Sequence, residues 1–392
     1  MPQWNLVVPR LLLLLCLLAA CGPGLRAEGQ VKVFILSGQS NMEGKAAAST
    51  LAAVIDDPAT HERFKHLRGE SGWAVRDDVW VTFLDREESP VSPRHGPLSV
   101  GFGSPKRITE ESGRKAPAPG IGPELGIGWV LGEHYEEPVL LIKAAWGGRA
   151  LKQTFRPPSA MPSDEELTQR LAEVRRNNPE TTLDGLRATY GSDYRKVLEE
   201  TQKVLADLKT YCPAYEESEG YELAGFIWFQ GWNDGVGAGN PEYSEQLAHF
   251  IRDLRHDLKA PALPFVIGEL GIDGPEAEGW IVEFRRQQAA VAALPEFREN
   301  VRFAETARYW PSTPDLSSEW AAFRAAAQAN EKKGADDATR VDPGEFYRVN
   351  WEQKYKEPLA FTSDRRYHYL GSARCYYEMG QSMAHALLEI AD

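Results

Sequence analysis

A serine in a glycine-containing turn, directly after an apolar run, is the residue of this chain best suited to nucleophilic chemistry. The run at 31–36 is short, mostly apolar and rich in β-branched residues, a pattern typical of a strand covered on both faces. It leads into Gly38, Gln39, Ser40 and Asn41, where the glycine permits a sharp turn. Ligands bind at the carboxyl ends of parallel strands, so Ser40 is a candidate nucleophile. The same residue types could instead only cap the next helix.

Candidate oxyanion donors follow two later strand-like runs. Gly147 and Gly148 come after the apolar run at 138–142, and Asn233 comes after the run at 223–229. A reacting serine needs such donors, because negative charge develops on the carbonyl oxygen that it attacks. Glycines let backbone N–H groups approach a ligand, and asparagine adds a side-chain amide donor.

The chain also contains a histidine suited to act as the general base. His368 lies in a polar loop just before the last predicted helix, and a loop in that place can present a side chain to the strand ends. Among the other seven histidines, only His95, in a Pro/Gly-containing loop, is an alternative. Serine, base and oxyanion donors together are the residue types of acyl transfer.

An alternation of strand and helix patterns would bring these residues together. Strand-like runs occur at 31–36, 79–84, 138–142, 223–229, 264–267 and 301–304. Segments with helical spacing occur at 124–135, 194–208, 243–258, 280–293 and 371–390. This alternation predicts one α/β domain over 31–392, with a central parallel sheet and helices on both faces. We expect a surface loop at 104–122 and helices at 163–176 and 317–333 as insertions.

The first 20 residues have the features of an export signal. Arg10 precedes an apolar segment at 11–20 that is shorter than the about 20 residues of a membrane span. The residues around Cys21 resemble the lipobox at which bacterial lipoproteins are cleaved and acylated. The favoured hypothesis is therefore a lipoprotein anchored to a bacterial envelope only through Cys21, with 21–30 as a linker. Cleavage near Ala27, giving a secreted or periplasmic protein, is the alternative.

Composition and charge limit the classes of partner. With 392 residues, 42% of them hydrophobic, the chain can bury a large core. A net charge of −13 argues against nucleic acid or an anionic membrane surface as partners of the folded domain. No Cys-x-x-Cys or His-Glu-x-x-His motif is present, so we expect no metal and no cofactor. Cys212 and Cys375 could pair in an exported domain or remain buried thiols, and nothing indicates an oligomeric state.

The sequence resembles the SGNH hydrolases in four ordered blocks: Gly38-Gln39-Ser40-Asn41, Gly147-Gly148, Gly231-Trp232-Asn233-Asp234 and the late His368. The Gly-Gln-Ser-Asn-Met opening and the Trp-Phe-Gln-Gly segment narrow this resemblance to the sialate O-acetylesterase-like branch, which includes carbohydrate esterase family six. The resemblance covers residues 31–386. It implies a flavodoxin-like three-layer α/β/α fold and a serine esterase that removes O-acetyl groups from carbohydrates, such as acetylated sialic acid or xylan.

The resemblance also implies a role for each matching residue. Ser40 would attack the acetyl carbonyl, and His368 would activate first Ser40 and then the hydrolytic water. The oxyanion would be bound by the N–H groups of Ser40 and Gly147 and by the side chain of Asn233. Gln230 would help to line the oxyanion pocket.

The triad acid departs from the pattern of the family. The family usually places an aspartate three residues before the histidine, where this chain has Arg365. Asp364, four residues before His368, is the first candidate. Asp234 or a Ser-His pair without a carboxylate are the alternatives. Because the acid orients the histidine, its loss would lower activity without abolishing the chemistry.

Three further residues are candidates for substrate binding. Trp146 and Trp232 lie at predicted strand ends, where a flat apolar ring suits a sugar. Arg149, beside the glycine pair, could bind an acidic substrate group or form a surface salt bridge. Two other functions remain open: an esterase for other short-chain or aryl esters, and a catalytically silent glycan-binding surface lipoprotein.

Overall fold

The computed structural model describes residues 29–86, 93–104, 119–237, 239–333 and 337–391. The predicted export signal, Cys21 and most of the predicted linker lie outside these residues, as does most of the predicted loop at 104–122. Among the described helices, none is both long and apolar enough to cross a membrane. Cys212 and Cys375 are both buried free thiols, so the disulfide alternative is wrong.

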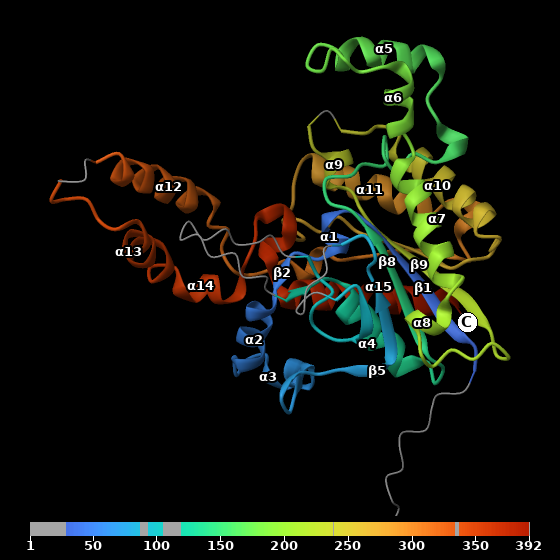
Figure 1. The fold of residues 1–392 in the computed structure, drawn as a ribbon, viewed down its shortest axis with the longest axis horizontal. Coiled ribbons are helices and arrows are strands. Elements are labelled where there is room, and N and C mark those ends of the chain that lie inside the picture. Colours follow the sequence, from blue (N-terminus) through green and yellow to red (C-terminus); the bar gives the residue numbers. More distant parts are fainter. Residues whose placement is uncertain (1–28, 87–92, 105–118, 238, 334–336, 392) are drawn as a thin grey trace, which may run out of the picture.

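A seven-stranded sheet forms the centre of the molecule, with the order β11-β10-β9-β1-β8-β5-β6 (Figure 1). Its strands are β1 (Val31–Gly38), β5 (Arg76–Thr82), β6 (His95–Leu98), β8 (Val139–Ala145), β9 (Tyr221–Phe229), β10 (Phe265–Gly268) and β11 (Val301–Ala304). Neighbouring strands are parallel except β5 and β6. If the six parallel strands are numbered along the chain, their order across the sheet is 2-3-1-4-5-6. The corresponding order in flavodoxin is 2-1-3-4-5. All six predicted strands are confirmed.

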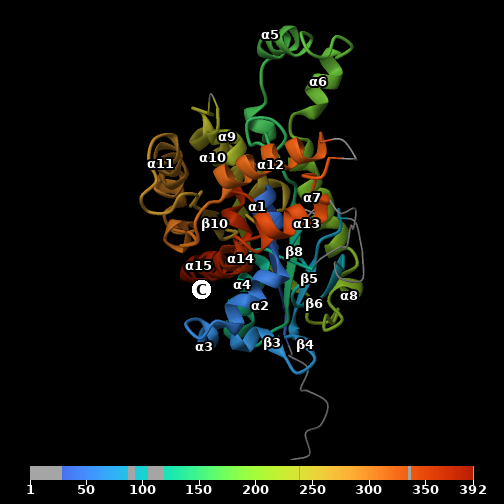
Figure 2. The same ribbon diagram turned by 90° about the vertical axis from the view of Figure 1, so that its left-hand side faces the viewer.

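Helices cover both faces of this sheet, which confirms the predicted three-layer α/β/α architecture (Figure 2). One face carries α4 (Glu124–His134) and α15 (Ala373–Ala391), and the other carries α7 (Ser192–Leu205) and α10 (Tyr243–Asp257). Beside α10 lies α11 (Trp280–Ala292), which also contacts β11. Every residue of β8 is buried, because both faces of the strand are covered.

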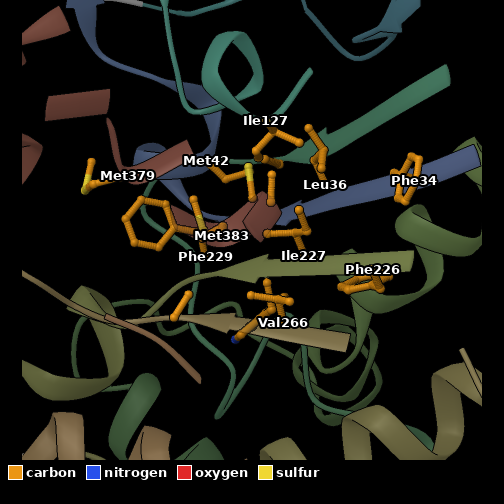
Figure 3. Close-up of a cluster of buried hydrophobic side chains, with 14 of the residues drawn as sticks. Phe34, Leu36, Met42, Ile127, Phe226, Ile227, Phe229, Val266, Met379 and Met383 are labelled. Carbon is orange, nitrogen blue, oxygen red and sulfur yellow. The ribbon is translucent and has the colours of Figure 1, made fainter. Parts of the chain in front are cut away.

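The main hydrophobic core extends over both faces of the sheet, and one part of it lies between the sheet and α15. Figure 3 shows Met383 of α15 close to Phe229 of β9. The helices α4 and α15 cross closely because both have glycines at the crossing. A Cβ on Gly126 would lie 2.0 Å from the carbonyl oxygen of Tyr377, so no other residue fits there.

Two helical arms extend from the domain (Figure 1). The first contains α5 (Asp164–Val174) and α6 (Leu183–Thr189), and α5 starts with a capping box formed by Ser163 and Glu166. The second contains α12 (Ser317–Glu331), α13 (Pro343–Tyr347) and α14 (Lys356–Phe361). The predicted helices at 163–176 and 317–333 are thus confirmed as α5 and α12. The second arm lies in the chain between β11 and α15, so it leads directly into the loop that carries His368.

The remaining short elements surround the ends of the sheet. These are α1 (Ser40–Glu43), β2 (Ala46–Ala47), α2 (Ala48–Asp56), α3 (His61–Phe64), β3 (Arg68–Gly69), β4 (Gly72–Trp73), β7 (Gly120–Ile121), α8 (Leu208–Tyr211) and α9 (Trp232–Gly235). Of these, α1 and α9 directly follow β1 and β9.

The order in which strands are added to the sheet reverses between β1 and β9. After β1 the chain builds β5 and β8 on one side, and after β9 it builds β10 and β11 on the other. Such a switch point is where open α/β sheets bind ligands. Gly38 pairs with both Ala145 and Phe229, so β1, β8 and β9 end at the same level. The segments that carry Ser40, Gly147 and Asn233 therefore meet at this edge.

Candidate active site

Two glycines that cannot be replaced without strain hold Ser40 at the end of β1. Gly38 has φ 151°, and a Cβ there would lie 2.1 Å from the carbonyl oxygen of Phe229. Gly44, which ends α1, has φ 80°, and a Cβ there would lie 2.1 Å from Cα of Gly122. Ser40 is the first residue of α1, so its N–H has no partner within the helix. The turn thus presents the hydroxyl and the backbone N–H of one residue together.

His368 lies beside this serine, although 328 residues separate the two in the sequence. The distance from His368 Nε2 to Ser40 Oγ is 3.0 Å, and both residues are buried. A loop at residues 363–371, here called the base loop, carries the histidine. His95, the alternative base, instead lies in the edge strand β6, with its ring 5.6 Å from that of Tyr211.

The base loop has an unusual backbone. Tyr369 and Leu370 have φ values of 50° and 55°, a left-handed conformation that costs about 1–2 kcal/mol per residue for side chains of this size. The N–H groups of Ser363 and Asp364 both donate to the carbonyl oxygen of Leu370, at 2.8 and 3.0 Å. The Tyr369 hydroxyl accepts from the N–H of Gly271 at 2.9 Å. Backbone pairing and side-chain burial therefore hold a strained turn in place.

This turn brings Asp364 to the far side of the histidine ring. Asp364 Oδ1 lies 3.1 Å from His368 Nδ1, and the two side chains are only 2% and 5% exposed. Asp364 reaches His368 across four residues because its N–H group is hydrogen-bonded to the carbonyl oxygen of Leu370, which brings the start of the base loop back to its end. Asp234, the alternative acid, is engaged elsewhere and accepts from the N–H groups of Leu151 and Lys152 at 2.6 and 3.0 Å.

Gly147 and Asn233 follow β8 and β9, the two strands that flank β1 in the sheet. A Cβ on Gly147 would lie 3.5 Å from Ser40 Cβ, so this exposed glycine leaves space directly beside the nucleophile. Asn233 Nδ2 donates to the carbonyl oxygen of Gly148 at 3.3 Å. Its Oδ1 accepts from Gln39 Nε2 at 3.1 Å, which fixes the orientation of the amide.

Residues 30–306 match the model of a family described as carbohydrate esterase, sialic acid-specific acetylesterase. The chain belongs to this family. The match includes Ser40, Gly147 and Asn233 but ends before Asp364 and His368. The predicted family is therefore confirmed, and the chain is a carboxylic-ester hydrolase of the carbohydrate acetylesterase class.

Solved structures similar to this esterase include NanS, with 15% identity, coverage of 92% of this chain and 97% of NanS, and a TM-score of 0.48. A protein from Arabidopsis thaliana is 17% identical, with 92% and 98% coverage and a TM-score of 0.44. A carbohydrate acetylesterase from Xanthomonas citri is 16% identical, with 72% and 52% coverage and a TM-score of 0.37. No curated protein matches the sequence.

Gln39 of the esterase connects the two strand ends, a role that the sequence analysis did not assign. Its Oε1 accepts from the N–H groups of Gly231 and Asn233, both at 3.3 Å, and from Gln230 Nε2 at 3.2 Å. Gln230, expected to line the oxyanion pocket, is 2% exposed, and its Nε2 also donates to Asp234 Oδ2 at 2.7 Å. The structure thus places Gln230 behind the pocket, where it supports Gln39.

Asn41 joins the nucleophile turn of the esterase to the base loop. Its Nδ2 donates to the carbonyl oxygen of Tyr367 at 3.2 Å, and its Oδ1 accepts from the Tyr376 hydroxyl at 2.7 Å. Asn41 and Tyr376 are both buried, so the bond between them does not compete with water. Only its place next to Ser40 in the motif could have indicated this role from the sequence.

A buried ion pair supports the nucleophile turn from below. Lys143, on β8, is fully buried and donates to Glu124 Oε2 at 2.6 Å and to the carbonyl oxygens of Glu43 and Phe102 at 2.9 and 2.8 Å. Burial lowers the pKa of Lys143 to about 8, and the nearby Glu124 carboxylate opposes this shift. The ammonium group therefore fixes the end of α1 through Glu43.

Replacing Lys143 by methionine is expected to destabilise the esterase by about 3–5 kcal/mol, because Glu124 would remain as an uncompensated buried charge. Urea unfolding followed by tryptophan fluorescence measures this change. The double variant Lys143→Met/Glu124→Leu should regain part of the loss, since neither charge remains. A single variant as stable as the wild type would contradict the assignment of an ionic pair.

Trp146, a candidate sugar-binding residue, is mostly covered. Its side chain is in the core and only 7% of the residue is exposed, with the ring 6.1 Å from that of Phe155. The indole N–H donates to Asp85 Oδ2 at 2.7 Å, and Lys196 Nζ lies 2.8 Å from the same oxygen. Trp146 thus supports the Gly147 turn and has little ring surface for a sugar. Arg149 is largely exposed, with its Nε 3.5 Å from Asp193 Oδ2.

Glu200, on α7, makes the stability of the esterase depend on pH. Burial raises the pKa of its carboxyl from 4.5 to about 7, and the negative charge of Asp85 adds to the effect. Because the pKa is higher in the folded state, the stabilising effect of the bound proton is present below about pH 4.5 and is lost as the pH rises through 7.

The variant Glu200→Gln, which keeps the neutral form, is therefore expected to match the wild type at pH 4.5. At pH 8 the Tm of the variant should exceed that of the wild type by about 2–4 °C or more. Calorimetry at the two pH values tests this, with Glu199→Gln on the exposed side of the same helix as the control. An equal Tm difference at both pH values would contradict the assignment.

Proposed function

We propose that this esterase removes O-acetyl groups from carbohydrates through a covalent acyl-enzyme on Ser40. The observation that carries this proposal is the contact chain from Ser40 Oγ to His368 Nε2 and from His368 Nδ1 to Asp364, at 3.0 and 3.1 Å. Nucleophile, base and orienting acid are thus in line, which is the arrangement of a serine hydrolase. Family membership supplies the carbohydrate acetyl ester as substrate.

In the first half-reaction, His368 Nε2 accepts the proton of Ser40 while Oγ bonds to the acetyl carbonyl carbon. The tetrahedral intermediate places its oxyanion near the N–H groups of Ser40 and Gly147 and the amide of Asn233. The intermediate collapses as the bond to the sugar oxygen breaks, and that oxygen takes the proton from His368. Asp364 stabilises the imidazolium and holds the ring in its orientation.

In the second half-reaction, a water molecule takes the place of the sugar. His368 accepts one proton of the water as its oxygen attacks the acetyl carbon, and the same donors bind the second oxyanion. The bond to Ser40 Oγ then breaks, the serine regains its proton from His368, and acetic acid leaves with the second proton of the water and ionises to acetate in solution. Each proton that His368 accepts is returned in the same half-reaction, so the enzyme is restored.

A substrate panel tests the proposal. It contains p-nitrophenyl acetate, butyrate and octanoate together with O-acetylated sialic acid and acetylated xylan. We expect acetate esters to react fastest, and at least one acetylated carbohydrate to release acetate. Similar rates for long acyl chains would favour the general esterase instead, and a purified protein inactive on every ester would contradict the proposal.

The catalytically silent alternative is tested by a serine-reactive fluorophosphonate. An activated Ser40 should be labelled stoichiometrically, because the probe needs the same base and oxyanion donors as the substrate. A properly folded protein that binds glycans but is not labelled would support the silent glycan-binding lipoprotein.

We also propose that the protein is exported and anchored through acylated Cys21, on the sequence resemblance described above. Metabolic labelling with a palmitate analogue in a bacterial host tests this. The wild type should incorporate the label, whereas Cys21→Ser should not. A soluble, unlabelled wild-type protein in the medium or periplasm would favour ordinary signal cleavage.

A further inference from the structure

Three aromatic side chains form a continuous row that starts at the catalytic base. The ring centroid of Tyr367 lies 4.4 Å from that of His368. Trp232 follows at 5.5 Å from Tyr367, and Trp280 follows at 5.4 Å from Trp232. These residues belong to the base loop, to α9 and to the first turn of α11, so only the folded chain brings them together.

The outer end of the row is open to solvent. Trp280 is 37% exposed, and Val236, next to α9, is 40% exposed. Trp232 and Tyr367 are only partly buried. Large apolar side chains that gather on the surface beside an active site are typical of a binding surface. The row thus differs from the fully buried tryptophan of the core, Trp228.

The backbone beneath the row is built to hold Trp280 in place. A Cβ on Gly235, the last residue of α9, would lie 2.3 Å from Cζ3 of Trp280. The indole therefore packs directly on the backbone of α9, two residues after Asn233. A fixed ring loses little conformational entropy when a ligand binds to it, which favours a role in recognition.

The chemistry of the row suits a chain of sugars. Aromatic rings present flat apolar faces, and the C–H faces of pyranose rings are flat and apolar too. The row extends away from the base, which is the group that returns a proton to the sugar oxygen. Sugar units on the leaving-group side of the ester would therefore lie along these rings.

We propose that Tyr367, Trp232 and Trp280 form a platform for the sugar units next to the acetylated one, so that the esterase prefers acetylated oligosaccharides to free acetylated monosaccharides. The inference rests on the proposed function, because it needs a carbohydrate ester at Ser40. It adds a substrate class, chains of at least two sugar units, and a residue, Trp280, that does not touch the reacting atoms.

The test uses Trp280→Ala in the full protein, with kcat and KM measured for three substrates. These are p-nitrophenyl acetate, an acetylated monosaccharide and an acetylated oligosaccharide of the same sugar. Two sugar series are used. The first compares acetylated xylose with acetylated xylotetraose, and the second compares O-acetylated sialic acid with O-acetylated sialyllactose. The wild type should have a higher kcat/KM for the oligosaccharide in the series that it hydrolyses faster.

The variant should lose at least about tenfold more kcat/KM on the oligosaccharide than on p-nitrophenyl acetate, mainly through KM, because truncating a tryptophan at a binding surface has effects of this size. Trp280→Phe keeps a flat ring and should recover part of the loss, whereas Trp280→Leu should not. Trp73→Ala, in β4 at the far end of the molecule (Figure 2), is the matched control. It should leave the ratio of kcat/KM on the oligosaccharide to kcat/KM on p-nitrophenyl acetate unchanged.

Several outcomes would overturn the platform. One is a wild type that hydrolyses mono- and oligosaccharide esters equally well. Another is a Trp280→Ala variant whose activity falls equally on all three substrates, which is what a merely structural role predicts. A wild type without activity on any acetylated carbohydrate, whether or not it hydrolyses p-nitrophenyl acetate, would instead reject the proposed function itself, so the two failures are distinguishable.

Discussion

Ser40→Ala is expected to lower kcat for acetyl-ester hydrolysis by on the order of 10⁵-fold, because removing the nucleophile of a serine hydrolase removes most of its catalysis. The hydroxyl oxygen that would form the acyl bond is 3.0 Å from the base. Steady-state rates with p-nitrophenyl acetate measure the loss, and the fluorophosphonate label should disappear with it.

Ser37→Ala is the matched control for this substitution. Ser37 lies on β1, three residues before Ser40, is fully buried, and its Oγ has no hydrogen-bond partner among the described residues. Its removal should leave kcat unchanged and should not destabilise the fold. If Ser40→Ala kept more than a small fraction of the wild-type rate, the acyl-enzyme mechanism would have to be abandoned.

Asp364→Asn is expected to have the second largest effect, a fall in kcat of about 10²–10⁴-fold with KM little changed. An asparagine amide at this place would favour the wrong tautomer of His368 and would not stabilise the imidazolium. Because the carboxylate is nearly buried and 3.1 Å from Nδ1, solvent cannot substitute for it. The kcat values of Asn and Glu variants at position 364 measure its contribution.

A carboxylate in the same region serves as the control. Asp273 pairs with Arg366 of the base loop, so Asp273→Asn should retain most of the activity. If Asp364→Asn stayed within a few-fold of the wild type, the pair Ser40 and His368 would suffice without an acid. That result would support the alternative of a catalytic dyad.

Strands, helices and the nucleophile were predictable because their signals are local. Buried strands show as short apolar runs, and helices show the spacing of one apolar face, so β1, β8 and α10 follow from a few neighbouring residues each. Ser40 was predictable because the glycine turn after such a run determines where a side chain points.

The sequence alone could not identify the triad acid among its candidates, nor the supporting roles of Gln39 and Asn41. The left-handed backbone at Tyr369 and Leu370 decides whether Asp364 reaches His368, and non-glycine residues give no local signal for that conformation. Gln230 and Trp146 illustrate the opposite difficulty. Both stand in the right motifs, yet packing covers them, and their polar atoms bond to other side chains of the protein.

The sequence by itself determined the succession of the main strands and helices along the chain. It also determined the serine at the end of the first strand and the histidine before the last helix. These depend on residue type and short-range spacing. The tertiary structure alone decided which carboxylate meets His368, how Gln39 and Asn41 join separate strand ends, and that three aromatic rings form a row beside the base. These depend on contacts between residues as far apart as Asn41 and Tyr376, which only the packing of sheet, loop and helices creates.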